Sequence, residues 1–103
     1  MFIGQVTGTV VATQKVASVN GKKLLLVNSM TVEGDKGATL KPSGRVAVAI
    51  DTVGAGEGDV VLITQGSSAR LTAMTSDVPT DAVIIGIIDA IQVASGEIYR
   101  KDK

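Results

Sequence analysis

The stretch DTVGAGEGDVVLITQGSSAR, residues 51–70, joins a glycine-dense turn to an apolar run and then to GSSAR. A dinucleotide-binding loop needs its glycines to be followed by a helix whose N-terminus meets the pyrophosphate. Here the apolar run at residues 60–63 is typical of a strand, the spacing is G-x-G-x-G, and no Lys-Ser or Lys-Thr pair follows. The stretch therefore predicts a tight turn between two strands, in which glycines take positive φ, rather than a phosphate cradle.

Alternating patterns on either side of this stretch predict further strands. Residues 2–13 alternate with period two, which predicts a strand with one inner face. That inner face comprises Phe2, Gly4, Val6, Gly8, Val10 and Ala12. Asn20-Gly21 favours a hairpin turn, and the apolar run of residues 22–27 predicts a returning strand that is covered on both sides.

The segment RVAVAID, residues 45–51, also predicts a strand. We expect Val46, Val48 and Ile50 to point inward and the small Ala47 and Ala49 to point outward.

Three further strands are expected after the glycine-dense turn. They cover residues 59–65, residues 81–93 with a bend or bulge at Gly86, and a short edge strand at Ile98 and Tyr99. Each run is rich in β-branched or aromatic residues, as strands are.

Breaks and caps complete the predicted order of elements. Residues 31–44 are polar and contain three glycines and a proline, which predicts the longest loop. Ser67 or Ser68 can cap a short helix over residues 68–74, and residues 77–81 form a second break.

Since no long helices alternate with the strands, the sequence predicts a single all-β domain over residues 1–103. We expect a small OB-like β-barrel of about five strands with one short helix.

The composition contains more apolar material than a thin core needs. Apolar residues make up 45% of the 103-residue chain, mean hydropathy is +0.35, and Phe2 and Tyr99 are the only aromatic residues. A domain of this size buries a modest share of its surface. The surplus fits either apolar faces buried between subunits or a monomer with an apolar β-core.

Charge and residue usage exclude several classes of function. Lys and Arg number ten, as do Asp and Glu, so the formal net charge is zero and no electrostatic footprint for nucleic acid or anionic lipid is present. The chain has no Cys and no His, which removes thiol chemistry and the commonest metal ligand and general base.

No signal peptide is visible, and the longest apolar run, residues 82–88, is too short to span a bilayer. We expect a soluble cytoplasmic protein.

Candidate catalytic residues do not form a reactive group. Asp51-Thr52 resembles the active loop of aspartic proteases, but Val53 occupies the position of the required glycine. Ser67 and Ser68 lack a histidine base, and Arg70 either pairs with a carboxylate or binds a small anion. The scattered carboxylates lack the spacing of a calcium loop. The sequence thus predicts no catalytic residue, no metal site and no cofactor.

OB-like barrels often bind single-stranded nucleic acid, so a small binding module for nucleic acid or an anionic ligand is the alternative function. That function needs aromatic stacking platforms and a positive groove. Two aromatic residues near the termini and zero net charge supply neither.

Four segments together resemble one known family. They are GQVTGTVVATQK at residues 4–15, NGKKLLLV at 20–27, AVAIDTVGAGEGDVVLITQGSSAR at 47–70 and PTDAVIIGIIDAI at 79–91. In this order they resemble the EutN/CcmL family, the pentameric vertex proteins of bacterial microcompartment shells. The departures lie in residues 31–44 and in the tail.

The resemblance implies a structural protein rather than an enzyme. It implies an OB-like barrel that forms a homopentamer, closes the vertices of a shell tiled by hexameric shell proteins, and lies within the cytoplasm. It implies no nucleic-acid or membrane partner. Balanced charge and surplus apolar surface agree with such a ring.

The glycine-rich turns are the candidate functional residues of such a ring. Small side chains would let neighbouring backbones approach, so we expect these turns at subunit contacts or near the five-fold axis. The candidates are Gly54, Ala55, Gly56, Gly66, Ser67, Ser68 and Arg70.

Overall fold

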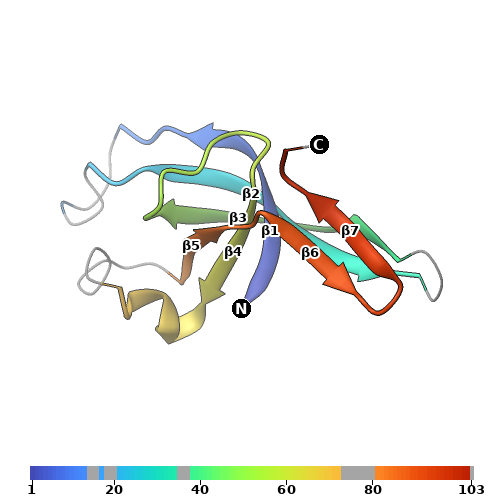
Figure 1. Cartoon of the computed structure of the whole chain (residues 1–103). Helices are drawn as coiled ribbons and strands as arrows, with labels where there is room; N and C mark the ends of the chain where they lie inside the picture. Colours follow the sequence, from blue (N-terminus) through green and yellow to red (C-terminus); the bar gives the residue numbers. More distant parts are fainter. Residues whose placement is uncertain (14–16, 18–20, 35–37, 73–80, 103) are drawn as a thin grey trace.

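The computed structural model describes residues 1–13, 17, 21–34, 38–72 and 81–102, with the side chains of Ser68 and Arg70 outside that description. Figure 1 shows a barrel with a projection at one side. The elements are β1 (Phe2–Val10), β2 (Leu24–Glu33), β3 (Thr39–Asp51), β4 (Val60–Gln65), the 3₁₀ helix η2 (Gly66–Arg70), β5 (Ala82–Ile87), β6 (Ala90–Val93) and β7 (Gly96–Arg100).

Five strands close into a barrel in the order β1-β2-β3-β5-β4. All neighbours are antiparallel except β3 and β5, which run parallel and pair at Ile50 with Val83 and at Asp51 with Ile84. The prediction of a small all-β barrel of about five strands, with one short helix between the fourth and fifth, is confirmed.

The barrel interior takes large side chains from some strands and small ones from β3. The buried cluster comprises Val6, Leu25, Val27, Ala49, Ala55, Val61, Ile63, Ala82 and Ile84. The predicted orientation of β3 is therefore wrong, since Ala49 is fully buried whereas Val46 and Val48 are 59% and 47% exposed. The register explains the reversal, because Ala49 lies opposite Leu25 and Ala47 opposite Val27. With those larger side chains already inside, the narrow interior has room only for methyl groups on β3.

A second, smaller core lies outside the barrel. Ile50 is buried with Ala69 of η2 and Val83 of β5, and Leu24 and Ile85 pack against this cluster. Ile50, which was predicted to point inward, is instead buried on the outer face of β3 beneath the short helix.

The predicted inner face of β1 ends early. Gly4 and Val6 are buried as expected, but the pairing with β2 shifts between Val6 and Gly8, so that Gly8 lies opposite Leu26. The shift inserts one extra residue into β1, and beyond it Thr7 and Thr9 are exposed whereas Gly8 and Val10 are only partly buried.

The loop predicted at residues 31–44 is wrong. β2 continues to Glu33 and β3 begins at Thr39, with Val32 paired to Leu40 and Thr31 to Lys41. The two strands extend beyond the barrel as an arm, which Figure 1 shows on the side of the β6–β7 hairpin. Both strands are largely exposed in this part, so their polar residues do not distinguish a ladder from a loop.

The predicted strand over residues 81–93 is divided into β5 and β6 by Ile88 and Asp89. The expected irregularity near Gly86 is confirmed, because Leu62 pairs with Gly86 and Ile63 with Ile84, which leaves Ile85 as the extra residue. The predicted strand at Ile98 and Tyr99 lies in β7, which pairs with β6 in a separate two-stranded sheet.

The helix predicted over residues 68–74 is shifted, since the observed 3₁₀ helix covers Gly66–Arg70. Residues 73–80, and with them most of the break expected at 77–81, lie outside the described residues, as does Asn20 of the predicted hairpin turn. Gly21 of that turn has the positive φ, 83°, that the turn requires.

The tight interior predicts different outcomes for two glycines of β1. A Cβ on Gly4 would lie 2.8 Å from Cδ1 of the buried Ile63 and 3.2 Å from the Asn28 carbonyl oxygen, whereas on Gly8 the nearest atom is 3.9 Å away. We expect Gly4→Ala to lower the free energy of unfolding by about 1–3 kcal/mol through overpacking. Gly8→Ala, the matched control, leaves it unchanged or raises it by up to about 1 kcal/mol. Urea unfolding curves of the two variants measure this, and equal stabilities would contradict it.

Candidate functional site

The loop between β3 and β4, residues 52–59, is held by the buried carboxylate of Asp51. One oxygen, Oδ1, accepts the backbone N–H of Val53 at 3.1 Å. The other, Oδ2, accepts those of Gly54 and Ala55 at 3.0 Å each. The side chain thus fills a concave arrangement of backbone donors of the kind that binds anions in other proteins.

A second carboxylate closes the other half of the loop. Asp59 Oδ2 accepts the N–H of Gly56 at 2.9 Å, and the Asp59 N–H donates to the Gly56 carbonyl at 3.0 Å. Val6 and Gly58 then tie the loop to β1, because the Gly58 N–H donates to the Val6 carbonyl at 2.8 Å and the Val6 N–H donates to the Asp59 carbonyl at 2.9 Å. The loop is therefore a rigid part of the barrel.

Lys23 and Thr52 add two side-chain hydrogen bonds to the loop. Lys23 Nζ donates to the Ala55 carbonyl at 2.7 Å, and the Thr52 hydroxyl donates to the Ile84 carbonyl at 2.8 Å. Neither side chain was identified from sequence, because each bonds to a backbone carbonyl 32 residues away along the chain.

The prediction of a tight turn between two strands is confirmed. Gly54 and Gly58 have φ of 80° and 92°, which disfavours residues with a side chain. Four N–H groups that a phosphate would need already donate to Asp51 and Asp59. Asp51 itself sits at a strand end with both oxygens engaged, as expected for a turn-capping residue rather than a protease carboxylate.

The second candidate loop lies at the opposite end of β4. Gly66 begins η2 with a φ of 67°, and its N–H donates to the Asp81 carbonyl at 2.8 Å. Ser67 is exposed, whereas Ala69 is fully buried against Ile50 and Val83. The structure thus separates the two candidate loops by the length of β4 and does not unite them into one site.

The individual candidate residues have different surroundings. Gly54 is exposed and Gly56 is partly buried, whereas the Ala55 side chain is fully buried within the barrel core of its own chain. The Ala55 methyl group therefore cannot contact a neighbouring molecule, and only the backbone there can contribute.

The exposed apolar residues are the feature that sequence reasoning missed. Val46 and Val48 point away from the barrel, and Val53 is 41% exposed on the loop that Asp51 holds rigid. The sequence shows the alternation of Ala47 and Ala49 with the valines, but not which of the two sets faces the interior.

Charged groups in the described part of the chain form ion pairs rather than a reactive cluster. Arg100 pairs with Glu97 within β7, and Lys101 lies 3.9 Å from Asp59. Among the described residues there is no group of three or more His, Cys, Asp or Glu that could hold a metal ion. No helix in that part of the chain is long and apolar enough to cross a membrane.

The fold and its loops define a class of protein: a small β-barrel whose turn donors are bound internally and whose apolar side chains lie partly outside. Comparison with known proteins identifies the family within this class. The family model of the ethanolamine utilisation protein EutN/carboxysome family (EutN_CcmL) matches residues 1–89. The chain belongs to the EutN/CcmL family, as its sequence motifs indicated.

Similar proteins cover almost the whole chain. The carboxysome shell vertex protein CcmL of Synechocystis sp. is 44% identical over 98% of this chain and 95% of its own length. The microcompartment shell vertex protein PduN of Salmonella typhimurium is 43% identical over 88% of this chain and 98% of its own length.

Solved structures extend the similarity to the fold. Gloeobacter violaceus CcmL superposes with a TM-score of 0.87 at 42% identity over the whole of both chains. GrpN from Rhodospirillum rubrum, a pentameric microcompartment shell protein, superposes with a TM-score of 0.74 at 40% identity over 91% of this chain and 99% of its own.

The capped loop predicts a specific loss of stability. Asp51→Asn keeps the size of the side chain but replaces one acceptor oxygen with an NH₂ group that faces backbone donors. We expect the free energy of unfolding to fall by about 2–3 kcal/mol, because buried donors lose a charged acceptor. Glu57→Gln is the control, since it removes the same charge from an exposed position of the same loop and changes stability by at most about 0.5 kcal/mol. Chemical denaturation compares the two, and equal curves would show that the carboxylate does not hold the loop.

Proposed function

We propose that this chain forms a homopentamer that closes the vertices of a bacterial microcompartment shell in the cytoplasm. The observation that carries the proposal is the full-length match to shell vertex proteins, including one described as pentameric. A ring of identical subunits also accounts for the apolar side chains that a single barrel leaves exposed, because each subunit buries part of its surface against its neighbours.

The expected partners are hexameric shell proteins around the pentamer, with no nucleic acid, no membrane and no catalytic activity. The internal use of the loop donors supports this proposal over an anion-binding module, since Asp51 and Asp59 already occupy them. Zero net charge and the scarcity of aromatic residues disfavour binding of single-stranded nucleic acid.

The glycine-rich turns belong to the proposal as subunit contacts or axial loops. Rigid, preorganised loops lose little conformational entropy when they are buried against a neighbour, which suits the loop that Asp51 and Asp59 fix. The proposed contacts are Gly54, Gly56 and the backbone of Ala55 in one loop, and Gly66, Ser67, Ser68 and Arg70 in the other.

Native mass spectrometry and light scattering of the purified wild-type chain test the proposal. We expect a single species of about five times the 10.5 kDa chain mass that persists at micromolar concentration. A stable monomer, or salt-sensitive binding of single-stranded DNA at the same concentrations, would contradict it.

The same measurement on Gly56→Val tests the loop placement. Gly56 does not have a positive φ, and a Cβ there would meet only Asp59 Oδ2 at 4.0 Å, so the folded subunit accepts a side chain that begins at this position. We expect a smaller pentamer fraction with unchanged far-UV circular dichroism. An unchanged pentamer would place this loop away from the contact.

A further inference from the structure

The outer face of β2 and β3 carries apolar side chains that this chain covers at one end only. Ile50 is buried there beneath η2, whereas Val48 and Val46, two and four residues earlier on the same face, are 47% and 59% exposed. Leu26, the pairing partner of Val48, is partly buried beside it. We call Leu26, Val46 and Val48 the outer patch. Val46 also lines a groove of about 400 Å³ between β3 and the start of β5, with Arg45, Gln65 and Asp81.

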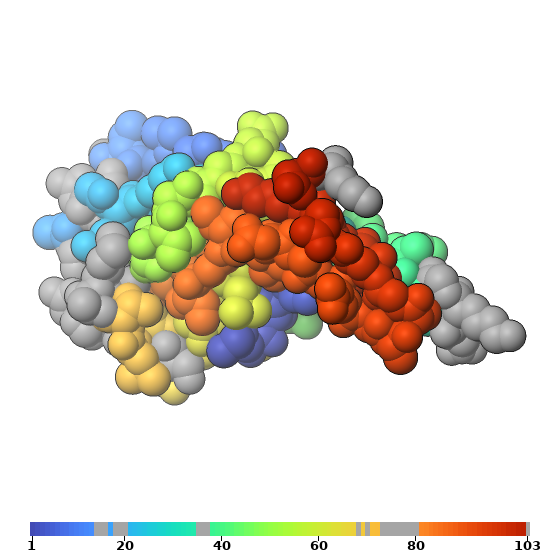
Figure 2. Space-filling view, in the orientation of Figure 1, coloured from blue at the N-terminus to red at the C-terminus, as the bar shows by residue number. Residues whose placement is uncertain are grey.

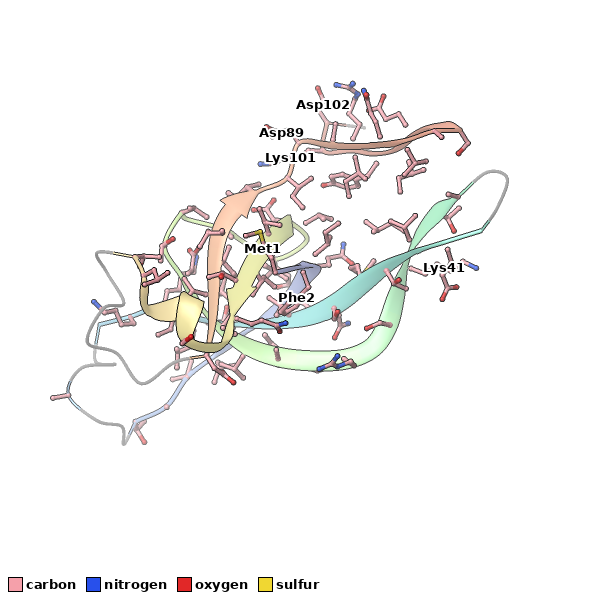
Figure 3. The ribbon with its side chains drawn as sticks, turned by 90° about the horizontal axis from the view of Figure 1, so that it is seen from below. Met1, Phe2, Lys41, Asp89, Lys101 and Asp102 are labelled. Carbon is pink, nitrogen blue, oxygen red and sulfur yellow. The ribbon has the colours of Figure 1, made fainter. Side chains whose placement is uncertain are left out.

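A second feature lies beyond the barrel. The β6–β7 hairpin and the arm formed by residues 30–33 and 39–42 extend to one side, and the molecule measures 48 × 24 × 23 Å. Figure 2 shows how the molecule tapers toward this hairpin. In Figure 3 the hairpin runs above the arm, which carries the labelled Lys41, and β7 contacts β3. We call this hairpin and arm the projecting end.

The projecting end has too little core to be stable by itself. Its hairpin is a two-stranded sheet, which is marginal in water without a further layer. Its apolar residues are incompletely covered, since Val32 is 40% exposed and Ile91, Val93, Ile98 and Tyr99 are only partly buried. An extension of this kind gains stability when another surface packs against it.

The outer patch and the projecting end are different surfaces, and a ring needs two different surfaces. In a closed head-to-tail ring each subunit presents one surface to the neighbour on one side and another surface to the neighbour on the other. We propose that the projecting end of one subunit packs on the outer patch of the next. The inference rests on the proposed homopentamer and assigns its contact surfaces.

A second copy of this chain fits the outer patch better than a partner of another kind. The patch is apolar, and the groove beside it carries one exposed residue of each charge sign, Arg45 and Asp81, so it offers no net field to a charged ligand. The projecting end also carries exposed apolar side chains. When identical copies associate head to tail, each contact buries the outer patch of one subunit and the projecting end of the next.

Cross-linking tests the contact in a folded pentamer. The sequence contains no cysteine, so Val48→Cys and Ser95→Cys, at the patch and at the exposed hairpin turn, provide the only thiols. We expect a short bismaleimide to link the double variant into a ladder of two to five chains on a denaturing gel, while each single variant stays unlinked. A pentamer by light scattering that gives no ladder, or a single variant that forms linked dimers, would overturn the assignment.

A charge placed in the patch supplies an independent readout. We expect Val48→Asp to reduce the pentamer fraction by at least about tenfold at a fixed concentration, because a buried unpaired carboxylate opposes association. Val48→Leu keeps the pentamer, and so does Val11→Asp, which changes a valine that is 85% exposed at the end of β1. If wild-type protein is not a pentamer, the proposed function fails; if Val48→Asp remains pentameric beside a pentameric wild type, only this assignment fails.

Discussion

The volume inside the five-stranded barrel is the constraint on which the rest of the structure depends. Gly4 has no space for even a methyl group without moving Ile63, and Ala49 fills the position opposite Leu25. The register of β3 against β2 places Ala47 and Ala49 on the inner face and Val46 and Val48 on the outer face. The closed interior thus determines how much apolar surface is left for other molecules to cover.

Backbone conformation and internal hydrogen bonds determine the shape of the glycine-rich loop. Gly54 and Gly58 adopt positive φ, which disfavours residues with a side chain, and Asp51 supplies from within the chain the negative charge that the backbone donors of the loop bind. The loop therefore resembles an anion-binding loop in sequence while its geometry serves rigidity. A barrel whose turns are fixed in this way presents a constant shape to its neighbours, which suits repeated assembly.

The elements governed by local patterns could be predicted from the sequence, and those governed by register could not. The turn before β4 was predictable from the strand-like run after its glycines, and so was the capping role of Asp51 at a strand end. The orientation of Val46 and Val48 was not, because an alternating run shows two faces but not which one meets Leu25 and Val27 across the ladder. The projecting arm was missed because its exposed polar residues are typical of a loop as well.

The same limit applies to the candidate site. Four sequence segments in the right order indicated the family, and the family model matches residues 1–89. They could not separate residues that fill the subunit from residues that face a neighbour, and Ala55, a candidate contact, proved to belong to the barrel core.

Methyl NMR of valine-labelled wild-type protein with a soluble paramagnetic probe tests the central claim most directly. The account predicts that, where the protein is assembled, the Val46 and Val48 methyl groups are shielded like those of buried Val27; broadening as strong as that of exposed Val11 would contradict it.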